Sequence, residues 1–199
     1  MFDKNLLKGK RILVTGGGSG LGKEMSRHFL TYGAEVIICG RREEVLQKTA
    51  KELSEETQGK ITAQSLDIRD SLAIEETINN IFDEGPLDGL VNNAAGNFIS
   101  RTNDLSPNGF NAIASIVFHG TFNMTNTVGK KWIELNKPGT ILSITTTWVW
   151  TGSPFVVPSA MSKSGINAMT KSLAVEWGPN NIRLNCIAPG PFPTEGAWS

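Results

Sequence analysis

Short apolar runs alternate along the chain with longer segments in which apolar residues recur every three to four positions. The runs read RILVT (11–15), EVIIC (35–39), ITAQSL (61–66), LDGLV (87–91), TILSIT (140–145) and IRLNCIA (182–188). Runs so short and so continuously apolar are typical of strands buried on both faces of a sheet. The sequence therefore predicts six buried strands.

The segments between these runs have helical periodicity. We expect helices over residues 21–32, 43–57, 71–82, 108–135 and 159–177. Gly33 and Gly59 are placed to end the first two. Strands that alternate with helices form parallel sheets with right-handed crossovers. The prediction is one domain over residues 1–199, an α/β fold with a doubly wound parallel sheet (Rossmann-like, three-layer αβα).

Composition limits the function. Lysine plus arginine and aspartate plus glutamate both total 19, so no excess charge favours nucleic acid as a partner. Cys39 and Cys186 lie in apolar runs, where a buried free thiol is the ordinary explanation, and this fits a reducing compartment. His28 and His119 form no metal-binding pattern with the two cysteines. The N-terminus has no long apolar run and no presequence, so we expect a cytoplasmic protein without a membrane segment.

A glycine-rich loop follows the first strand and precedes the first helix. It reads Thr15-Gly16-Gly17-Gly18-Ser19-Gly20-Leu21-Gly22. Glycines there allow backbone N–H groups to approach a pyrophosphate at the helix N-terminus, although a plain turn or helix cap has the same composition. The dinucleotide contacts are expected at Gly16, Gly18, Ser19, Gly20, Leu21 and Gly22.

The end of the second strand indicates which dinucleotide binds. An acidic residue there would accept hydrogen bonds from a ribose 2′-hydroxyl and repel a 2′-phosphate. This chain has Arg41 and Arg42 instead, whose guanidinium groups suit a phosphate. We expect NADP(H), bound mainly by Arg41. The alternative is that the two arginines pair with Glu43 and Glu44 at the start of a solvated helix.

The glycine loop and Asn92-Asn93-Ala94-Ala95-Gly96 resemble the motifs of the short-chain dehydrogenase/reductase family. The resemblance implies that Asn93 and Ala94 lie along the cofactor. It also implies that Asp67 and Ile68 bind the adenine, although Asp67 could simply cap a helix. The loop over the nicotinamide would be Pro189, Gly190, Pro191 and Phe192.

Most family members use a serine or threonine on the fifth strand and a Tyr-x-x-x-Lys on the next helix. Thr146 and Lys163 match the first and last of these residues. Ser159 stands where the tyrosine would be, and the only tyrosine of the chain is Tyr32, at the end of the first helix. Carbonyl reduction through a tyrosine is therefore disfavoured.

The Ser-x-x-x-Lys pattern is similar to that of the 2,4-dienoyl-CoA reductase subfamily. That resemblance extends to residues 92–100, 105–108, 155–160, 174–178 and 188–191. It implies reduction of a dienoyl-CoA to an enoyl-CoA in the β-oxidation of unsaturated fatty acids. The tyrosine of the subfamily, which follows its fifth strand, falls on Trp148 of this chain.

The resemblance assigns roles around an acyl-CoA substrate. Asn97 would donate to the thioester carbonyl, and Lys163 would hold the nicotinamide ribose. The indole N–H of Trp148 can also donate to developing negative charge, or the ring can merely wall the pocket. The expected catalytic residues are Lys163, Ser159, Asn97, Trp148 and Thr146. The expected substrate-binding residues are Asn97, Phe98, Ser106 and Ser159.

Two other functions remain open: a short-chain oxidoreductase for another carbonyl or alcohol, and an NADP-binding family member without catalysis. Members of the family usually run further and add a last strand beside the sixth. We therefore expect that strand to be absent and the chain to be truncated at its C-terminus. The resemblance also implies a homo-oligomer, a tetramer formed through the two long helices that end near Leu135 and begin near Ser159.

Overall fold

The computed structural model describes residues 2–190 and 192 of the 199-residue chain. Its centre is a six-stranded, all-parallel sheet with strand order β3-β2-β1-β4-β5-β6. The strands are β1 (Arg11–Thr15), β2 (Glu35–Gly40), β3 (Ile61–Ser65), β4 (Gly89–Asn92), β5 (Gly139–Ile144) and β6 (Ile182–Ile187). The predicted doubly wound sheet is confirmed.

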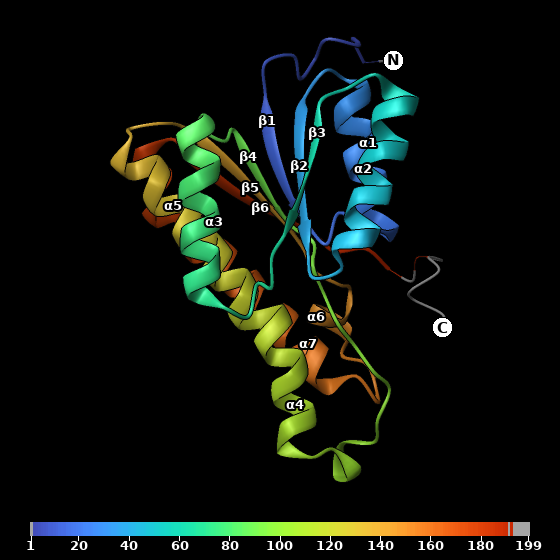
Figure 1. Cartoon of the computed structure of the whole chain (residues 1–199). Helices are drawn as coiled ribbons and strands as arrows, with labels where there is room; N and C mark the ends of the chain where they lie inside the picture. The colour runs from blue at the N-terminus through green and yellow to red at the C-terminus, as the bar shows by residue number, and fades with distance from the viewer. Residues whose placement is uncertain (1, 191, 193–199) are drawn as a thin grey trace.

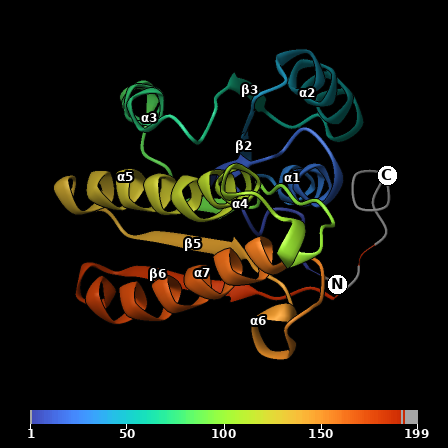
Figure 2. The ribbon, with the colours of Figure 1, turned by 90° about the horizontal axis from the view of Figure 1, so that it is seen from below.

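Helices cover both faces of the sheet, in two outer layers (Figures 1 and 2). One layer holds α1 (Gly20–Thr31) and α2 (Glu43–Thr57). The other holds α3 (Ser71–Glu84), α5 (Thr121–Glu134) and α7 (Val157–Glu176), and α4 (Pro107–Ala114) extends beyond the sheet. Short helical turns are α6 (Trp148–Thr151) and the 3-10 turns Thr102–Asp104 and Gly178–Asn180. Among the described residues, none of these helices is long and apolar enough to cross a membrane.

The long helix expected over residues 108–135 forms, but with an interruption. Between α4 and α5 the backbone runs as a π-helix over Ser115–Gly120. A second departure is at the end of α2, where the residue in the left-handed conformation is Gln58, at φ 57°, and not Gly59. Gly59 instead packs closely against Leu30, since a Cβ there would lie 2.8 Å from Cδ2 of that side chain.

Two apolar clusters hold the layers together, one on each face of the sheet. Alternate residues of β1 point to opposite faces, with Leu13 in the cluster under α3 and α5 and Val14 in the cluster under α1 and α2. Trp132 of α5 is fully buried, and its indole nitrogen donates to the carbonyl oxygen of Leu87 at 2.6 Å. Its ring lies over Gly139, where a Cβ would come within 2.3 Å.

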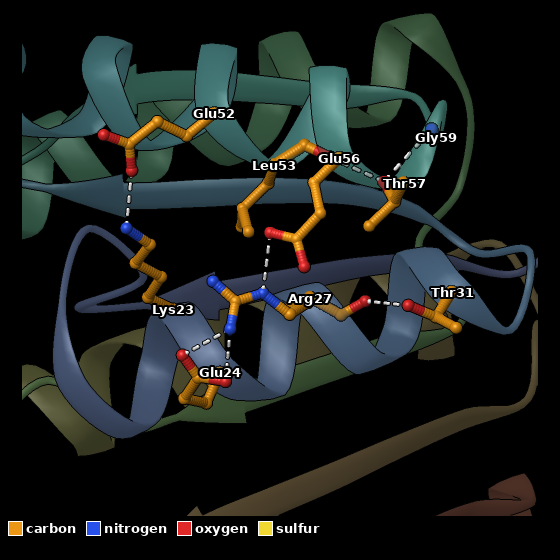
Figure 3. Close-up of polar contacts among 9 residues, drawn as sticks. All are labelled: Lys23, Glu24, Arg27, Thr31, Glu52, Leu53, Glu56, Thr57 and Gly59. Carbon is orange, nitrogen blue, oxygen red and sulfur yellow. Dashed lines mark hydrogen bonds and ion pairs between the residues drawn. The ribbon is translucent and has the colours of Figure 1, made fainter.

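Charged residues join α1 to α2 above their shared apolar contact (Figure 3). Lys23 Nζ donates to Glu52 Oε2 at 2.6 Å, and Arg27 Nε donates to Glu56 Oε2 at 3.0 Å. These pairs link the two helices at the surface, while the apolar cluster beneath them packs α1 against the sheet. The N-terminus of that helix, which follows the glycine loop, is positioned with it.

All six strands point the same way, so their carboxyl ends meet at one edge of the sheet. Chain connections leave β1 and β4, which are adjacent strands, toward opposite faces. Such a switch point opens a crevice at the carboxyl edge, where ligands of this fold class bind. Each expected site residue in the described part of the chain follows the end of a strand or lies on a helix close to this edge.

Candidate functional site

The glycine loop lies against the end of β4 and is held there by hydrogen bonds between side chains and the backbone. The hydroxyl oxygen of Thr15 accepts hydrogen bonds from the backbone N–H groups of Asn93 and Ala94, at 3.0 and 2.9 Å. The side-chain amide of Asn93 donates to the carbonyl oxygens of Thr15 and Gly16, at 2.9 and 3.2 Å. The second family motif thus fixes the shape of the first.

Two glycines of this loop leave no room for a side chain. Gly16 has φ +65°, and a Cβ on Gly22 would lie 2.3 Å from the carbonyl oxygen of Gly16. Thr49 of α2 supports the loop from outside, because its hydroxyl donates to the carbonyl oxygen of Gly18 at 2.8 Å. The loop is therefore tightly packed where it leads into α1.

Asn92, at the end of β4, anchors the neighbouring strand and helix. Its side-chain amide donates to the hydroxyl oxygens of Thr125 on α5, at 2.8 Å, and Ser143 on β5, at 3.4 Å. The side chain is buried, and no protein group of the described part of the chain donates to its Oδ1. These bonds stabilise the sheet beneath the site.

At the ends of β2 and β3, charged side chains border a hollow of about 480 Å³. Arg41 and Asp67 both line it. Arg69 donates from Nε to both carboxylate oxygens of Asp67, at 2.9 Å each, and from a terminal nitrogen to Oδ2. The pKa of Asp67 is lowered chiefly by the hydrogen bonds from Arg69, and the charge of Arg41 adds to the effect.

The sequence left open whether Asp67 binds the adenine or caps the next helix, and the structure shows which residue caps that helix. The N-terminal cap of α3 is Asp70, whose carboxylate accepts from the N–H groups of Leu72 and Ala73. Asp67 therefore does not cap α3, and its carboxylate remains at the edge of the hollow. Sequence reasoning missed Arg69 as its partner, although the two-residue spacing across a turn could have indicated it.

Ser159 and Lys163 lie one turn apart on the buried face of α7, as expected. Lys163 is only 6% exposed, and its ammonium group donates to the carbonyl oxygen of Ile144 at the end of β5. Burial lowers the pKa of Lys163 to about 8, and the nearby thiol of Cys186 opposes this change. The ammonium group is thus fixed at the carboxyl end of β5.

Thr146 is half-buried and follows β5, two residues after Ile144, whose carbonyl oxygen accepts from Lys163. Its neighbour Thr145 is a structural residue, since its hydroxyl and its backbone N–H both donate to the carbonyl oxygen of Ile187, at 3.1 and 2.8 Å. The N–H of Thr147 donates to Pro189 at 3.3 Å, which ties the expected nicotinamide loop to the end of β5. Of that loop, Pro191 lies outside the described residues.

The segment after β4 carries the expected substrate-binding residues. Asn97 and Phe98 are exposed, and the ring of Phe98 lies over Gly109 at the start of α4. The hydroxyl oxygen of Ser106 accepts from the N–H of Gly109 at 3.0 Å, so Ser106 is the N-terminal cap of α4. This structural role of Ser106 was not foreseen.

Trp148 begins α6, a four-residue helix that the sequence did not predict. The turn directly follows β5, so the half-buried indole of Trp148 lies at the carboxyl edge of the sheet. Trp150, two residues further on, is exposed. The structure thus brings Thr146, Trp148, Ser159 and Lys163 to one end of β5 and α7, with Asn97 on the segment that follows the neighbouring β4.

The chain is similar to known short-chain dehydrogenases in sequence and in structure. The family model of the short chain dehydrogenases matches residues 10–199. A Caenorhabditis elegans protein, "Probable 2,4-dienoyl-CoA reductase 3 [(3E)-enoyl-CoA-producing]", is 47% identical over 195 residues. A Bacillus subtilis protein, "Probable 2,4-dienoyl-CoA reductase [(2E)-enoyl-CoA-producing]", is 39% identical over 189 residues. A crystal structure of a short chain dehydrogenase from Bacillus anthracis aligns with a TM-score of 0.89 at 44% identity.

The alignments cover most of this chain but less of the other proteins. The alignment with the C. elegans protein covers 96% of this chain and 63% of that protein. The alignment with the B. subtilis protein covers 94% of this chain and 74% of that protein. The B. anthracis structure matches 93% of this chain and 75% of its own.

Proposed function

The chain belongs to the short-chain dehydrogenase family, and from that premise we propose that the protein is an NADPH-dependent reductase of 2,4-dienoyl-CoA thioesters. The observation that carries this proposal is the pair of Ser159 and Lys163 on the buried face of α7. The position that holds the proton-donating tyrosine in most of the family is thus a serine, as in the dienoyl-CoA reductases.

The residues at the carboxyl edge fit a nicotinamide dinucleotide. The glycine loop has no space for a Cβ at Gly16 or Gly22, so its backbone N–H groups are free to approach a pyrophosphate. Arg41 would hold the 2′-phosphate, with Arg42 beside it, and Asp67 and Ile68 would meet the adenine. Lys163 would donate to the hydroxyls of the nicotinamide ribose, and Pro189 and Phe192 would border the ring.

When bound, the nicotinamide supplies a hydride, which would go to the far carbon of the conjugated diene. Negative charge then develops on the thioester oxygen, and donors directed at that oxygen stabilise it. Asn97 would donate its amide N–H there, and we assign the second donor to the indole N–H of Trp148. An indole does not release its proton near neutral pH, so water would protonate the dienolate carbon.

The first test is oxidation of NADPH by the full-length protein with 2,4-hexadienoyl-CoA. We expect turnover with NADPH and a kcat/KM at least tenfold lower with NADH, because a guanidinium–phosphate contact contributes a charge-assisted bond of about 1.5–3 kcal/mol. Arg41→Ala should remove most of that preference. Equal use of NADH, or a simple ketone reduced as fast as the dienoyl thioester, would reject the proposal.

The role of Trp148 has its own variant. Trp148→Phe keeps the aromatic wall and removes the N–H, so kcat should fall about tenfold to a hundredfold while the Kd of NADPH stays unchanged. Unchanged turnover would leave Trp148 as a wall of the pocket only. NADPH binding without turnover in the wild-type protein would instead favour a second candidate, a non-catalytic NADP-binding protein, which the replacement of the subfamily's tyrosine by Trp148 already motivates.

A further inference from the structure

Two neighbouring segments lie at the proposed substrate site. Residues 93–106 follow β4 and carry Asn97 and Phe98, and residues 152–156 join α6 to α7. The two run beside each other below the sheet (Figures 1 and 2). Among the hydrogen bonds of the described residues, one joins them: the backbone N–H of Ser100 donates to the carbonyl oxygen of Phe155 at 2.9 Å.

The acceptor of this bond has an unusual backbone. Phe155 has φ 67°, in the left-handed region that bulky residues rarely adopt. Glycine or asparagine would adopt this conformation at lower cost. The Phe155 side chain is 49% exposed, so tight packing of its ring does not explain why this conformation persists.

The backbone around Phe155 is held at both ends. Gly152, at φ 66°, ends α6, and Val156 is buried at the start of α7. Between these fixed points, the φ and ψ angles of Phe155 set the direction of its carbonyl group. If Phe155 left the left-handed region, its carbonyl group would change direction. Among the described residues, the segment that carries Asn97 would then lose the one hydrogen bond that joins it to residues 152–156.

We propose that Phe155 is a positioning residue of the substrate site, whose left-handed backbone fixes the segment carrying Asn97 and Phe98 through the hydrogen bond to Ser100. The inference rests on the proposed function for the identity of the substrate. It does not depend on the Phe155 ring, and it assigns Phe155 no contact with the reacting atoms. Backbone strain is retained where a site needs one fixed geometry.

The test compares three substitutions that all remove the ring. Phe155→Asn and Phe155→Gly tolerate the left-handed conformation, whereas the β-branched residue in Phe155→Val does not. We expect F155V to raise the KM for 2,4-hexadienoyl-CoA about fivefold to tenfold, as the loss of one hydrogen bond would. The Kd of NADPH should change less than twofold, and F155N and F155G should keep the KM of the wild-type protein.

A second variant changes the donor of this hydrogen bond, the N–H group of Ser100. Ser100→Pro removes the donating N–H and should raise the KM as F155V does. Arg101→Pro is the matched control, because Arg101 already has φ −63°, which proline requires, and its N–H makes no hydrogen bond within the described residues. A KM that is equal in F155V and F155N, or in S100P and R101P, would overturn the inference.

Hydrogen exchange separates this inference from the proposed function. In the protein without substrate, the amides of residues 97–101 should exchange faster in F155V than in the wild-type protein, and at the wild-type rate in F155N. Absence of dienoyl-CoA reduction in the wild-type protein would defeat the proposed function alone. The exchange rates would then decide the inference, and equal rates in F155V and F155N would refute it.

Discussion

At the scale of a single residue, Lys163 shows how burial in a site changes the pKa of a charged group. The ammonium group is buried against the carbonyl oxygen of Ile144, and burial lowers its pKa from 10.5 to about 8. Folding therefore costs free energy as long as the group is charged in both states. Such a cost is acceptable where the charge is to meet a ligand.

The pH dependence of stability follows from this pKa. Between pH 8 and 10.5 the unfolded chain holds a proton on Lys163 that the folded chain has lost, so the free energy of unfolding rises with pH in that window. Lys163→Met removes this contribution. We expect the change in the free energy of unfolding from pH 7.5 to pH 10, measured with urea, to be more positive for the wild-type protein than for the variant. Parallel pH profiles of the two proteins would show that burial leaves the pKa of Lys163 unperturbed.

How well single site residues could be predicted depended on whether they belong to a motif. Ser159 and Lys163 were found because they match the Ser-x-x-x-Lys pattern of the resembled subfamily, and the structure places both on the buried face of α7. The partner of Asp67 was not found, because the bond from Arg69 depends on how a turn folds and not on periodicity. The roles assigned to these residues, and the preference for NADPH, remain predictions.

Arg11 connects three elements at the amino edge of the sheet, opposite the site. Its side chain is about 10% exposed, and it pairs with Glu35 of β2 at 3.0 Å and with Glu84 of α3 at 2.7 Å. One terminal nitrogen donates to the carbonyl oxygens of Ile81, at 2.5 Å, and Gly85. Arg11 thus satisfies carbonyl groups that the end of α3 leaves free.

Removal of this arginine should loosen α3. Arg11→Met is expected to lower the free energy of unfolding by about 2–3 kcal/mol, because the buried carbonyl of Ile81 and the partly buried carbonyl of Gly85 and carboxylate of Glu35 lose their donor. The control is Arg27→Met in the exposed pairs between α1 and α2, which should cost at most about 1 kcal/mol. Chemical denaturation measures both, and similar losses in the two variants would contradict the ranking. The Kd of NADPH should change in neither.

The sequence predicted best those elements whose burial determines the pattern of apolar residues. All of β1 is buried, and its continuous apolar run identified it without ambiguity. The turn α6 has only four residues, with two tryptophans and two β-branched residues, and such a composition does not indicate a helix. The π-helix over Ser115–Gly120 was missed because one extra residue in a turn leaves an amphipathic pattern almost unchanged.

For the whole molecule, topology was predictable because parallel strands with short connections allow few arrangements. The quaternary structure is a separate matter, and the expected homo-oligomer remains a proposal. An apolar surface supports it: Phe118 of the π-helix, Phe122 of α5 and Met161 of α7 are 40%, 47% and 57% exposed. Exposed aromatic and methionine side chains of this size are typical of contacts between subunits.

Self-association through this surface can be tested directly. Phe122→Glu places a charge on it and should shift the mass measured by light scattering toward the monomer. Leu72→Glu is the control, since Leu72 is 76% exposed on α3 and lies outside the surface formed by those three residues. A monomeric wild-type protein, or equal masses for wild type and F122E, would reject this interface.

The placement of the tryptophans makes the protein its own optical probe. Of the five tryptophans, Trp198 lies outside the described residues. Trp132 and Trp177 are buried in the core, whereas Trp150 is 69% exposed and Trp148 is half-buried next to the proposed nicotinamide position. Indole emission overlaps the absorption of a reduced nicotinamide, so a bound coenzyme would quench the α6 pair by energy transfer. The core pair would report unfolding through a red shift, and one spectrum would therefore distinguish the occupancy of the site from the integrity of the fold.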